Sequence, residues 1–197
     1  MTFRSEEKII LNKQEVALLK AEFLKKKIKT LYPIREINSI YFDTDDLKLY
    51  QDSEEGTLPR KKIRIRNYPF SKNNLFFLET KISSVEGRYK ISVNLNKNLK
   101  NNYLESGILD AQYGILKKKI LINYKREYYF FNDVRFTLDY DIKYSTLTGA
   151  QFYFEKFIIF EIKSSLNYDH QLIQNIISLT RYRFSKYDQA IKACIKK

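Results

Sequence analysis

Strand-length segments with alternating charged and apolar residues place the strongest constraint on this chain. The clearest is RKKIRIRNY, residues 60–68. Successive side chains of a β-strand point to opposite faces, so Lys62, Arg64 and Arg66 share one face and Ile63 and Ile65 the other. Neighbouring cations on that face lie about 7 Å apart and repel one another. The stretch therefore predicts a strand with one apolar and one cationic face.

The same alternation recurs along the chain and gives each strand a charged face. Ordinary half-exposed strands would explain any single one, but nearly every such position holds Arg, Lys or Glu. The alternative is a barrel whose charged faces converge on a tunnel, with the apolar faces packed against outer helices. Besides Lys62, Arg64 and Arg66, the charged faces carry Arg4, Glu6 and Lys8; Glu79 and Lys81; Arg88 and Lys90; Arg126; Arg135, Thr137, Asp139 and Asp141; and Glu161 and Lys163.

The order of elements predicts one α+β domain over residues 1–197. With only 5 Gly and 3 Pro, and no linker or repeat, the elements should be long. Consecutive strands with short connections favour a closed, antiparallel, eight-stranded barrel with helices outside. Strands are expected at 3–11, 35–44, 60–68, 73–83, 87–95, 119–131, 134–145 and 154–165, and helices at 12–30, 108–119, 169–179 and 185–197, with a helical turn at 46–50 and a loop at 51–59.

The charge balance points to an anionic partner. The 36 Lys and Arg residues outnumber the 23 Asp and Glu residues, which gives a net charge of +13. Nucleic acid, an acidic membrane surface and phosphate compounds all fit this excess. Arg predominates on the strands, and the planar, forked guanidinium of Arg suits phosphate oxygens.

The single cysteine, Cys194, is expected to be a small buried residue of the last helix. The absence of a signal peptide or apolar span predicts a cytoplasmic protein.

Carboxylates on the charged faces could hold a divalent metal. Mg²⁺ and Mn²⁺ prefer oxygen ligands and bridge carboxylates to substrate phosphates. The alternative is that each carboxylate forms an ion pair with a neighbouring cation, which is as good an explanation for Glu6 and Glu79. The candidate metal ligands are Glu161, Glu6, Glu79 and Asp139.

The segment FSKYDQA, residues 184–190, predicts a phosphate site at a helix N-terminus. Ser185 is a good N-cap with Asp188 at the third helical position, and Lys186 lies in the first turn. A cation there is unfavourable unless an anion binds the free N–H groups.

Histidine-based catalysis, glycine-loop nucleotide binding and cysteine-based sites have little support. His170 is the only histidine and is expected in the first turn of a helix, and no phosphate-binding glycine loop or paired cysteines occur.

Eight segments together resemble a known family. They are RSEEK, SIYFDT, RKKIRIRNY, FLETK, YKREYYFF, VRFTLDYDI, FEIKSS and SKYDQA, in the order found in the VTC domain. That domain is the catalytic module of the vacuolar transporter chaperone polyphosphate polymerases and their bacterial relatives, within the triphosphate tunnel metalloenzyme superfamily. The resemblance covers nearly the whole chain. It implies transfer of the γ-phosphate of ATP to a growing polyphosphate chain, with Mn²⁺ or Mg²⁺.

The resemblance also implies residue roles. Lys8, Arg64, Arg66 and Lys81 would bind the triphosphate, and Glu161 would hold the metal. We take Arg64, Arg66, Lys8 and Glu161 as the expected catalytic set. The expected substrate-binding residues are Lys62, Lys81, Arg88, Lys90, Arg126, Arg135, Lys163, Ser185 and Lys186.

Two other functions stay open from the sequence. A hydrolase of triphosphate or tripolyphosphate could use the same fold, although Arg4 replaces the first glutamate that the superfamily's hydrolase branch often carries. A basic, tyrosine-rich module could instead bind polyanions without catalysis. We expect ATP and polyphosphate as partners and no nucleic acid. A membrane-protein partner at the inner face of the membrane, and the oligomeric state, stay open.

Overall fold

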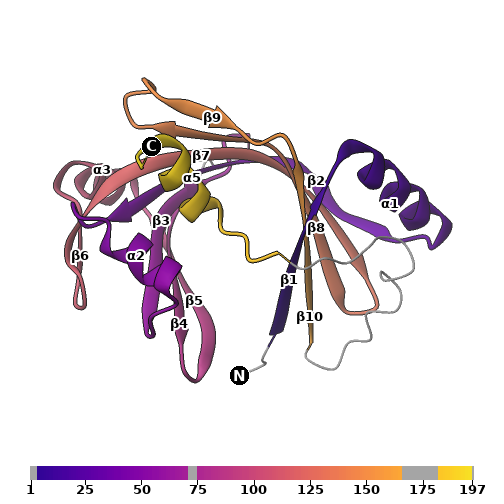
Figure 1. Cartoon of the computed structure of the whole chain (residues 1–197), viewed down its shortest axis with the longest axis horizontal. Coiled ribbons are helices and arrows are strands. Elements are labelled where there is room, and N and C mark those ends of the chain that lie inside the picture. Colours follow the sequence, from indigo (N-terminus) through magenta and orange to yellow (C-terminus); the bar gives the residue numbers. More distant parts are fainter. Residues whose placement is uncertain (1–3, 71–74, 166–181, 197) are drawn as a thin grey trace. The chain divides into compact units, whose positions relative to one another are not determined.

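The computed structural model describes residues 4–70, 75–165 and 182–196 (Figure 1). Its described strands form one ten-stranded sheet in the order β1-β10-β8-β7-β2-β3-β4-β5, with β6 beside β7 and β9 beside β8. The strands are β1 (Arg4–Leu11), β2 (Lys29–Asp43), β3 (Arg60–Asn67), β4 (Phe76–Ser84), β5 (Gly87–Leu95), β6 (Ile108–Asp110), β7 (Gly114–Phe131), β8 (Val134–Thr146), β9 (Phe152–Phe154) and β10 (Ile158–Ser165). The described helices are α1 (Lys13–Lys25), α2 (Lys48–Glu55), α3 (Lys97–Ser106) and α5 (Lys186–Cys194).

The antiparallel α+β class is confirmed, whereas closure of the barrel is not. The pairs β1–β10, β10–β8, β2–β3, β3–β4 and β4–β5 are antiparallel. Among the described strands the hydrogen-bonded path ends at β1 on one side and at β5 on the other. None of the helices in these ranges has the length and apolarity needed to cross a bilayer.

The chain divides into two compact units. The first comprises Met1–Arg35, Tyr124–Ile142 and Phe154–Phe184, and the second Glu36–Asn123, Lys143–Tyr153 and Ser185–Lys197. The long strands β2, β7 and β8 contribute residues to both units. The expectation of a single domain stays a prediction.

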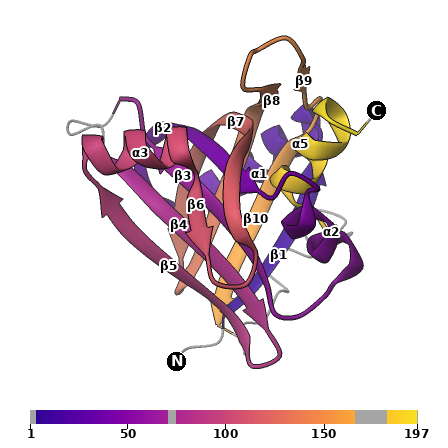
Figure 2. The same cartoon turned by 90° about the vertical axis from the view of Figure 1, so that its left-hand side faces the viewer.

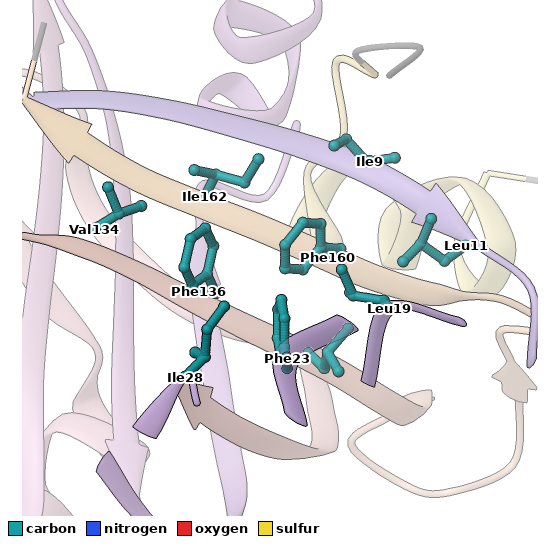
Figure 3. Packing of buried hydrophobic residues seen from close by; sticks show 10 residues of the cluster. Ile9, Leu11, Leu19, Phe23, Ile28, Val134, Phe136, Phe160 and Ile162 are labelled. Atoms are coloured by element: carbon teal, nitrogen blue, oxygen red, sulfur yellow. The ribbon is translucent and has the colours of Figure 1, made fainter. Parts of the chain in front are cut away.

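The core of the first unit lies between α1 and the strands β1, β10 and β8 (Figure 3). Asn12 and Glu15 form a capping box at the start of α1, which begins beside the first residue of the helix expected at 12–30. Phe23 of α1 packs against Phe136 and Phe160, with ring centroids 5.6 and 6.3 Å apart. The apolar residues of these strands therefore face the helix. The buried members are Ile9, Leu11, Leu19, Phe23, Ile28, Val134, Phe136, Leu138, Phe160 and Ile162.

The core of the second unit lies under α2, α3 and the β6–β7 hairpin. Ile63 and Ile65 of β3 are each 2% exposed and cluster with Leu49 of α2. Figure 2 shows α3 and the β6–β7 hairpin in front of β3 and β4. Leu99 and Tyr103 of α3 pack against the same cluster. The predicted apolar face of residues 60–68 is thus confirmed, and its cations lie on the opposite face.

Several predicted boundaries are wrong, for local reasons. The helix expected at 108–119 is the strand β6 and the start of β7, while α3 lies earlier, capped by Asn96. Gly107 (φ 94°) and Gly114 (φ 74°) turn the chain into a hairpin. A Cβ at Gly107 would stand 2.5 Å from the carbonyl oxygen of Leu116, so this position requires glycine.

Other differences concern element ends and the last part of the chain. Helix α2 extends through residues 51–55, which were expected to form a loop, and α1 ends at Lys25, so that β2 begins at Lys29. The expected helix at 169–179, with His170, lies outside the described residues. Cys194 is buried on α5, as predicted.

Candidate triphosphate-binding site

Strand β3 carries a row of three cations on the face opposite its buried isoleucines. The β3 cation row consists of Lys62, Arg64 and Arg66. In the register of β3 with β4, Arg64 pairs with Glu79 and Lys62 with Lys81. The row is enclosed rather than flat, since the side chain of Arg66 is 8% exposed and that of Arg64 is 22% exposed.

Glu79 forms ion pairs with two cations of this row and with one on β5. Its Oε2 accepts hydrogen bonds from Nε and Nη2 of Arg64 at 2.8 and 2.6 Å, and Nη1 of Arg66 lies 3.6 Å away. Its Oε1 accepts from Nζ of Lys90 at 2.9 Å. Burial raises the pKa of Glu79, but the charges of Arg64, Arg66 and Lys90 outweigh it and lower the pKa to about 2. Glu79 thus forms the ion pairs that the sequence left as an alternative.

This lowered pKa predicts an acid-sensitive contribution to stability. Because the folded pKa lies below the ordinary value of 4.5, the contribution is complete above pH 4.5 and disappears as the pH falls toward 2. A shift of this size corresponds to about 3 kcal/mol in the free energy of unfolding. Denaturant unfolding of the native chain and of Glu79→Gln between pH 2 and 7 should show a gap that narrows as the pH falls. A constant gap would contradict the assignment.

Two hydroxyl groups on β2 join the β3 cation row and were missed by the sequence analysis. Nη1 of Arg64 donates to Oη of Tyr41 at 2.6 Å, and Nε of Arg66 donates to Oγ of Ser39 at 3.2 Å. Burial raises the pKa of Tyr41, but Arg64, Arg66 and Lys62 outweigh it, so the pKa is lowered. The signal was present in SIYFD, where Ser39, Tyr41 and Asp43 alternate with apolar residues.

Tyr41 is fixed in place by the last helix. Its ring stacks on that of Tyr187 of α5, with centroids 4.9 Å apart and planes at 13°. The hydroxyl of Tyr187 donates to Asp43, whose carboxylate also accepts from the backbone N–H groups of Leu49 and Tyr50 at the start of α2. Asp43 therefore holds α2 and α5 against β2, and indirectly orients the tyrosine that contacts Arg64.

Lys62 is bound by α5. Its Nζ donates to Oγ of Ser185 at 2.6 Å and to both carboxylate oxygens of Asp188 at 2.9 and 3.0 Å. Ser53 of α2 also donates to Asp188, at 2.9 Å. Ser185 caps α5 as predicted, and Lys186 is its first residue, half-buried. Lys62 thus contacts the N-terminus of α5, and its predicted role in substrate binding stays a prediction.

The remaining predicted cations of the second unit lie on β4 and β5. Lys81 is half-buried and pairs in register with Lys90, whose side chain is 51% exposed. Arg88 is exposed near the start of β5. Among the predicted substrate ligands of this unit, Arg66 is the buried one, and Arg64 and Lys62 are half-buried.

The first unit carries a second charged face, centred on Glu161. The register pairs Lys8 with Glu161, Glu6 with Lys163, and Lys163 with Arg135. Three cations surround the carboxylate of Glu161. Nζ of Lys163 lies 3.1 Å from its Oε1, Nη2 of Arg126 lies 3.4 Å from its Oε2, and Lys8 interacts with its charge.

The cations near Glu161 differ in their other contacts and in their exposure. Arg126 binds Asp139 in a bidentate ion pair, with Nε–Oδ1 at 2.5 Å and Nη2–Oδ2 at 2.6 Å. Nζ of Lys8 donates to the backbone carbonyl of Phe184 at 2.9 Å, just before α5. Arg135 is exposed. The prediction that this face and the β3 cation row share one cavity stays a prediction.

Asp141 does not share the face of Asp139 as the alternation predicted. Its backbone is in the left-handed region (φ 51°), and its carboxylate accepts from Lys125 at 2.9 Å. Lys125 and Arg126 are adjacent on β7 and so point to opposite faces. The left-handed residue therefore moves Asp141 away from the face centred on Glu161.

The environment of Glu161 keeps it ionised. Burial raises its pKa, but a hydrogen bond with Glu6 and the charges of Lys163, Arg126 and Lys8 lower the pKa well below the usual range. The side chain is 4% exposed, and the ion-pair partner of its Oε1 is Nζ of Lys163. A buried carboxylate that stays ionised is a suitable ligand for a divalent cation.

The four predicted metal ligands do not fit a metal equally well. In the described ranges no group of three or more His, Cys, Asp or Glu side chains could hold a metal ion by itself. Glu79 and Asp139 have both carboxylate oxygens bound by Arg or Lys, so we assign them structural ion pairs instead. Glu161 fits better, because its cation partners lie farther away, Lys163 at 3.1 Å and Arg126 at 3.4 Å. With Glu6 it matches the one or two carboxylates that, together with substrate phosphates, commonly hold Mg²⁺.

Comparison with known proteins agrees with this architecture. A candidate adenylate cyclase from Bacillus halodurans is 17% identical, with a TM-score of 0.64 over 93% of this chain and 94% of that one. One from Vibrio parahaemolyticus is 16% identical, with a TM-score of 0.56 over 98% and 99%. HpAC1 from Hippeastrum, an adenylyl cyclase candidate described as having a dominant triphosphatase activity, is 14% identical, with a TM-score of 0.51 over 88% and 83%.

These structures share their fold with this chain. No curated protein is similar enough to count as a relative. The family model of the VTC domain, by contrast, matches residues 3–195, nearly the whole chain. The protein therefore belongs to the VTC domain family.

Proposed function

We propose that this protein is a metal-dependent polyphosphate polymerase, which transfers the γ-phosphate of ATP to a growing polyphosphate chain. The observation that carries the proposal is the VTC domain match over residues 3–195. The two charged faces support it. Arg64 and Arg66 are fixed by Glu79, Tyr41 and Ser39 before any substrate arrives, so little reorganisation is needed when phosphate binds.

In this proposal the residues act by position and charge. Phosphoryl transfer requires placement and neutralisation of oxygens more than covalent chemistry. Arg64, Arg66, Lys8, Lys81 and Arg126 would bind phosphate oxygens, and Ser185 with Lys186 would bind phosphate at the N-terminus of α5. Glu161 and Glu6 would hold Mn²⁺ or Mg²⁺, which supplies positive charge to the transferring group.

The acceptor explains why the sites need no general base. The end of a polyphosphate chain is already ionised, so the attacking oxygen does not have to lose a proton. A hydrolase would instead have to orient a water molecule. The charged residues described above consist of cations and ion-paired carboxylates, which suits an ionised acceptor.

The product distinguishes the proposal from its main rival. Purified protein incubated with ATP and Mn²⁺ should form phosphate chains that a gel resolves. Omission of the metal should stop their formation. Conversion of ATP to ADP and free phosphate alone would contradict a polymerase and identify a hydrolase.

A triphosphate hydrolase is the second candidate function. It is favoured by the Hippeastrum protein, which shares the fold and is described as having a dominant triphosphatase activity. A non-catalytic polyanion-binding module has less support, because a flat, exposed set of arginines would suit it, whereas the side chains of Arg66 and Arg126 are 8% and 12% exposed. A cytoplasmic location, with a membrane-protein partner left open, remains part of the proposal.

A further inference from the structure

An aromatic and cationic cluster adjoins the charged face of the first unit and has no role in the proposed phosphate chemistry. It consists of Tyr32 and Arg35 near the start of β2 and Tyr128 on β7; we call it the Tyr32 cluster. Cζ of Arg35 lies 4.1 Å from the ring centroid of Tyr32 and 5.6 Å from that of Tyr128. The two tyrosine rings meet edge to face, with centroids 5.4 Å apart and planes at 87°.

The cluster is continuous with the guanidinium beside Glu161. Tyr128 follows Arg126 by two residues on β7, so both side chains lie on the same face. Cζ of Arg126 lies 5.9 Å from the ring of Tyr128. Arg126 in turn contacts Asp139 and Glu161. One strand face therefore leads from the proposed phosphate site directly to the tyrosines.

Within the cluster, the exposure of the two rings differs. Tyr128 is 8% exposed and serves as the base against which the others pack, whereas Tyr32 is 44% exposed. The contacts with Arg35 and Tyr128 fix the ring of Tyr32 while leaving much of it accessible. A ring held in this way loses little conformational entropy when a ligand stacks on it.

The chemistry of this surface suits a nucleobase. Unpaired bases stack on tyrosine rings and on arginine planes, and such stacking tolerates any base. A nucleoside triphosphate is anionic at one end and aromatic at the other. A cationic face that ends in an exposed, fixed tyrosine matches this order.

We propose that Tyr32 stacks on the base of the nucleoside triphosphate whose phosphates reach Arg126. This inference rests on the proposed use of a nucleoside triphosphate and adds where its nucleoside end lies. Inorganic tripolyphosphate has no aromatic end and gains nothing from the cluster. The cluster therefore selects nucleotide over inorganic triphosphate and favours purines, which offer the larger stacking surface.

Calorimetric titration with two ligands tests the proposal. The ligands are the non-hydrolysable β,γ-imido analogue of ATP and inorganic tripolyphosphate. Tyr32→Ala should raise the Kd of the ATP analogue at least about fivefold, the lower range of base–aromatic stacking, and leave that of tripolyphosphate unchanged. Tyr32→Phe, which keeps the ring, should bind both ligands like the native chain. The matched control is Tyr89→Ala on β5, a tyrosine 49% exposed in the other unit, which should change neither Kd.

The outcomes separate this inference from the proposed function. Equal effects of Tyr32→Ala on both ligands, or no effect on either, would overturn the base site while leaving triphosphate binding intact. A native chain that binds neither ligand would contradict the proposed function itself. If Tyr32→Ala does not fold, the native chain decides, because stacking requires tighter binding of ATP than of CTP and equal affinities would overturn it.

Discussion

Replacing Glu161 by Gln should lower kcat/KM for ATP by about 10²- to 10³-fold, the scale of losing one preorganised charge at a reacting centre. Glutamine has the same shape but no charge, so Lys163, Arg126 and Lys8 lose the anion that they share. The proposed metal also loses its best-placed ligand. Steady-state turnover measured over a series of Mn²⁺ concentrations checks this, and the half-saturating concentration of metal should rise.

A control separates metal binding from electrostatic support of Arg126. Asp139→Asn also removes an anionic partner of Arg126, but Asp139 has both oxygens bound by that guanidinium. Asp139→Asn should therefore lower the free energy of unfolding but leave the half-saturating concentration of Mn²⁺ at its native value. If Glu161→Gln and Asp139→Asn shift the metal requirement equally, Glu161 is a structural ion-pair partner and not a ligand. Thermal unfolding of both variants shows whether each remains folded.

Replacing Arg66 by Ala should abolish detectable polymer and lower kcat/KM by about 10²-fold. Arg66 is among the most enclosed cations of its face, with its side chain 8% exposed and its Nε bonded to Ser39. A planar guanidinium can bind two phosphate oxygens at once, which lysine cannot do. Arg66→Lys should therefore recover only part of the lost activity in the gel assay.

Lys90→Ala provides the matched control for Arg66→Ala. Both substitutions remove a cation from Glu79, but the side chain of Lys90 is 51% exposed. If Arg66 acts only by keeping Glu79 paired, the two variants should lose activity to the same extent. If Arg66 binds substrate, Lys90→Ala should lose much less activity than Arg66→Ala, because the charge of an exposed cation is screened by solvent.

The faces of individual strands could be predicted because side-chain alternation is a local property of an extended chain. Ile63 and Ile65 are buried and the β3 cation row lies opposite; Phe160 and Ile162 are buried opposite Glu161. The caps at Asn12 and Ser185 were predictable for the same reason, since a cap involves residues three apart. The helix expected at 108–119 was wrong because its apolar spacing fits a hairpin as well. Only the structure shows that α3 ends at Gly107 and that the chain turns between Asp110 and Gly114.

The partner of each charge could not be predicted. Glu79 and Glu161 occupy equivalent positions in their strands, yet Glu79 accepts from Arg64 at 2.6 Å and from Lys90 at 2.9 Å, whereas Lys163 and Arg126 lie 3.1 and 3.4 Å from Glu161. Lys62 looked like a substrate ligand and is bound by Asp188, more than a hundred residues away in sequence. Tyr41 looked like an ordinary strand residue and lies against Arg64.

The sequence by itself thus determined eight of the ten described strands, most of their charged faces and the family to which the chain is similar, because those features depend on period-2 geometry and on the order of motifs. The tertiary structure decided which charges are neutralised and which stay available. That outcome depends on strand register and on the docking of α5, which join residues far apart in the chain. In the opening stretch, Lys62 contacts Ser185 and Asp188 at the start of α5, and its role in substrate binding stays a prediction. Arg64 and Arg66 remain the proposed phosphate ligands.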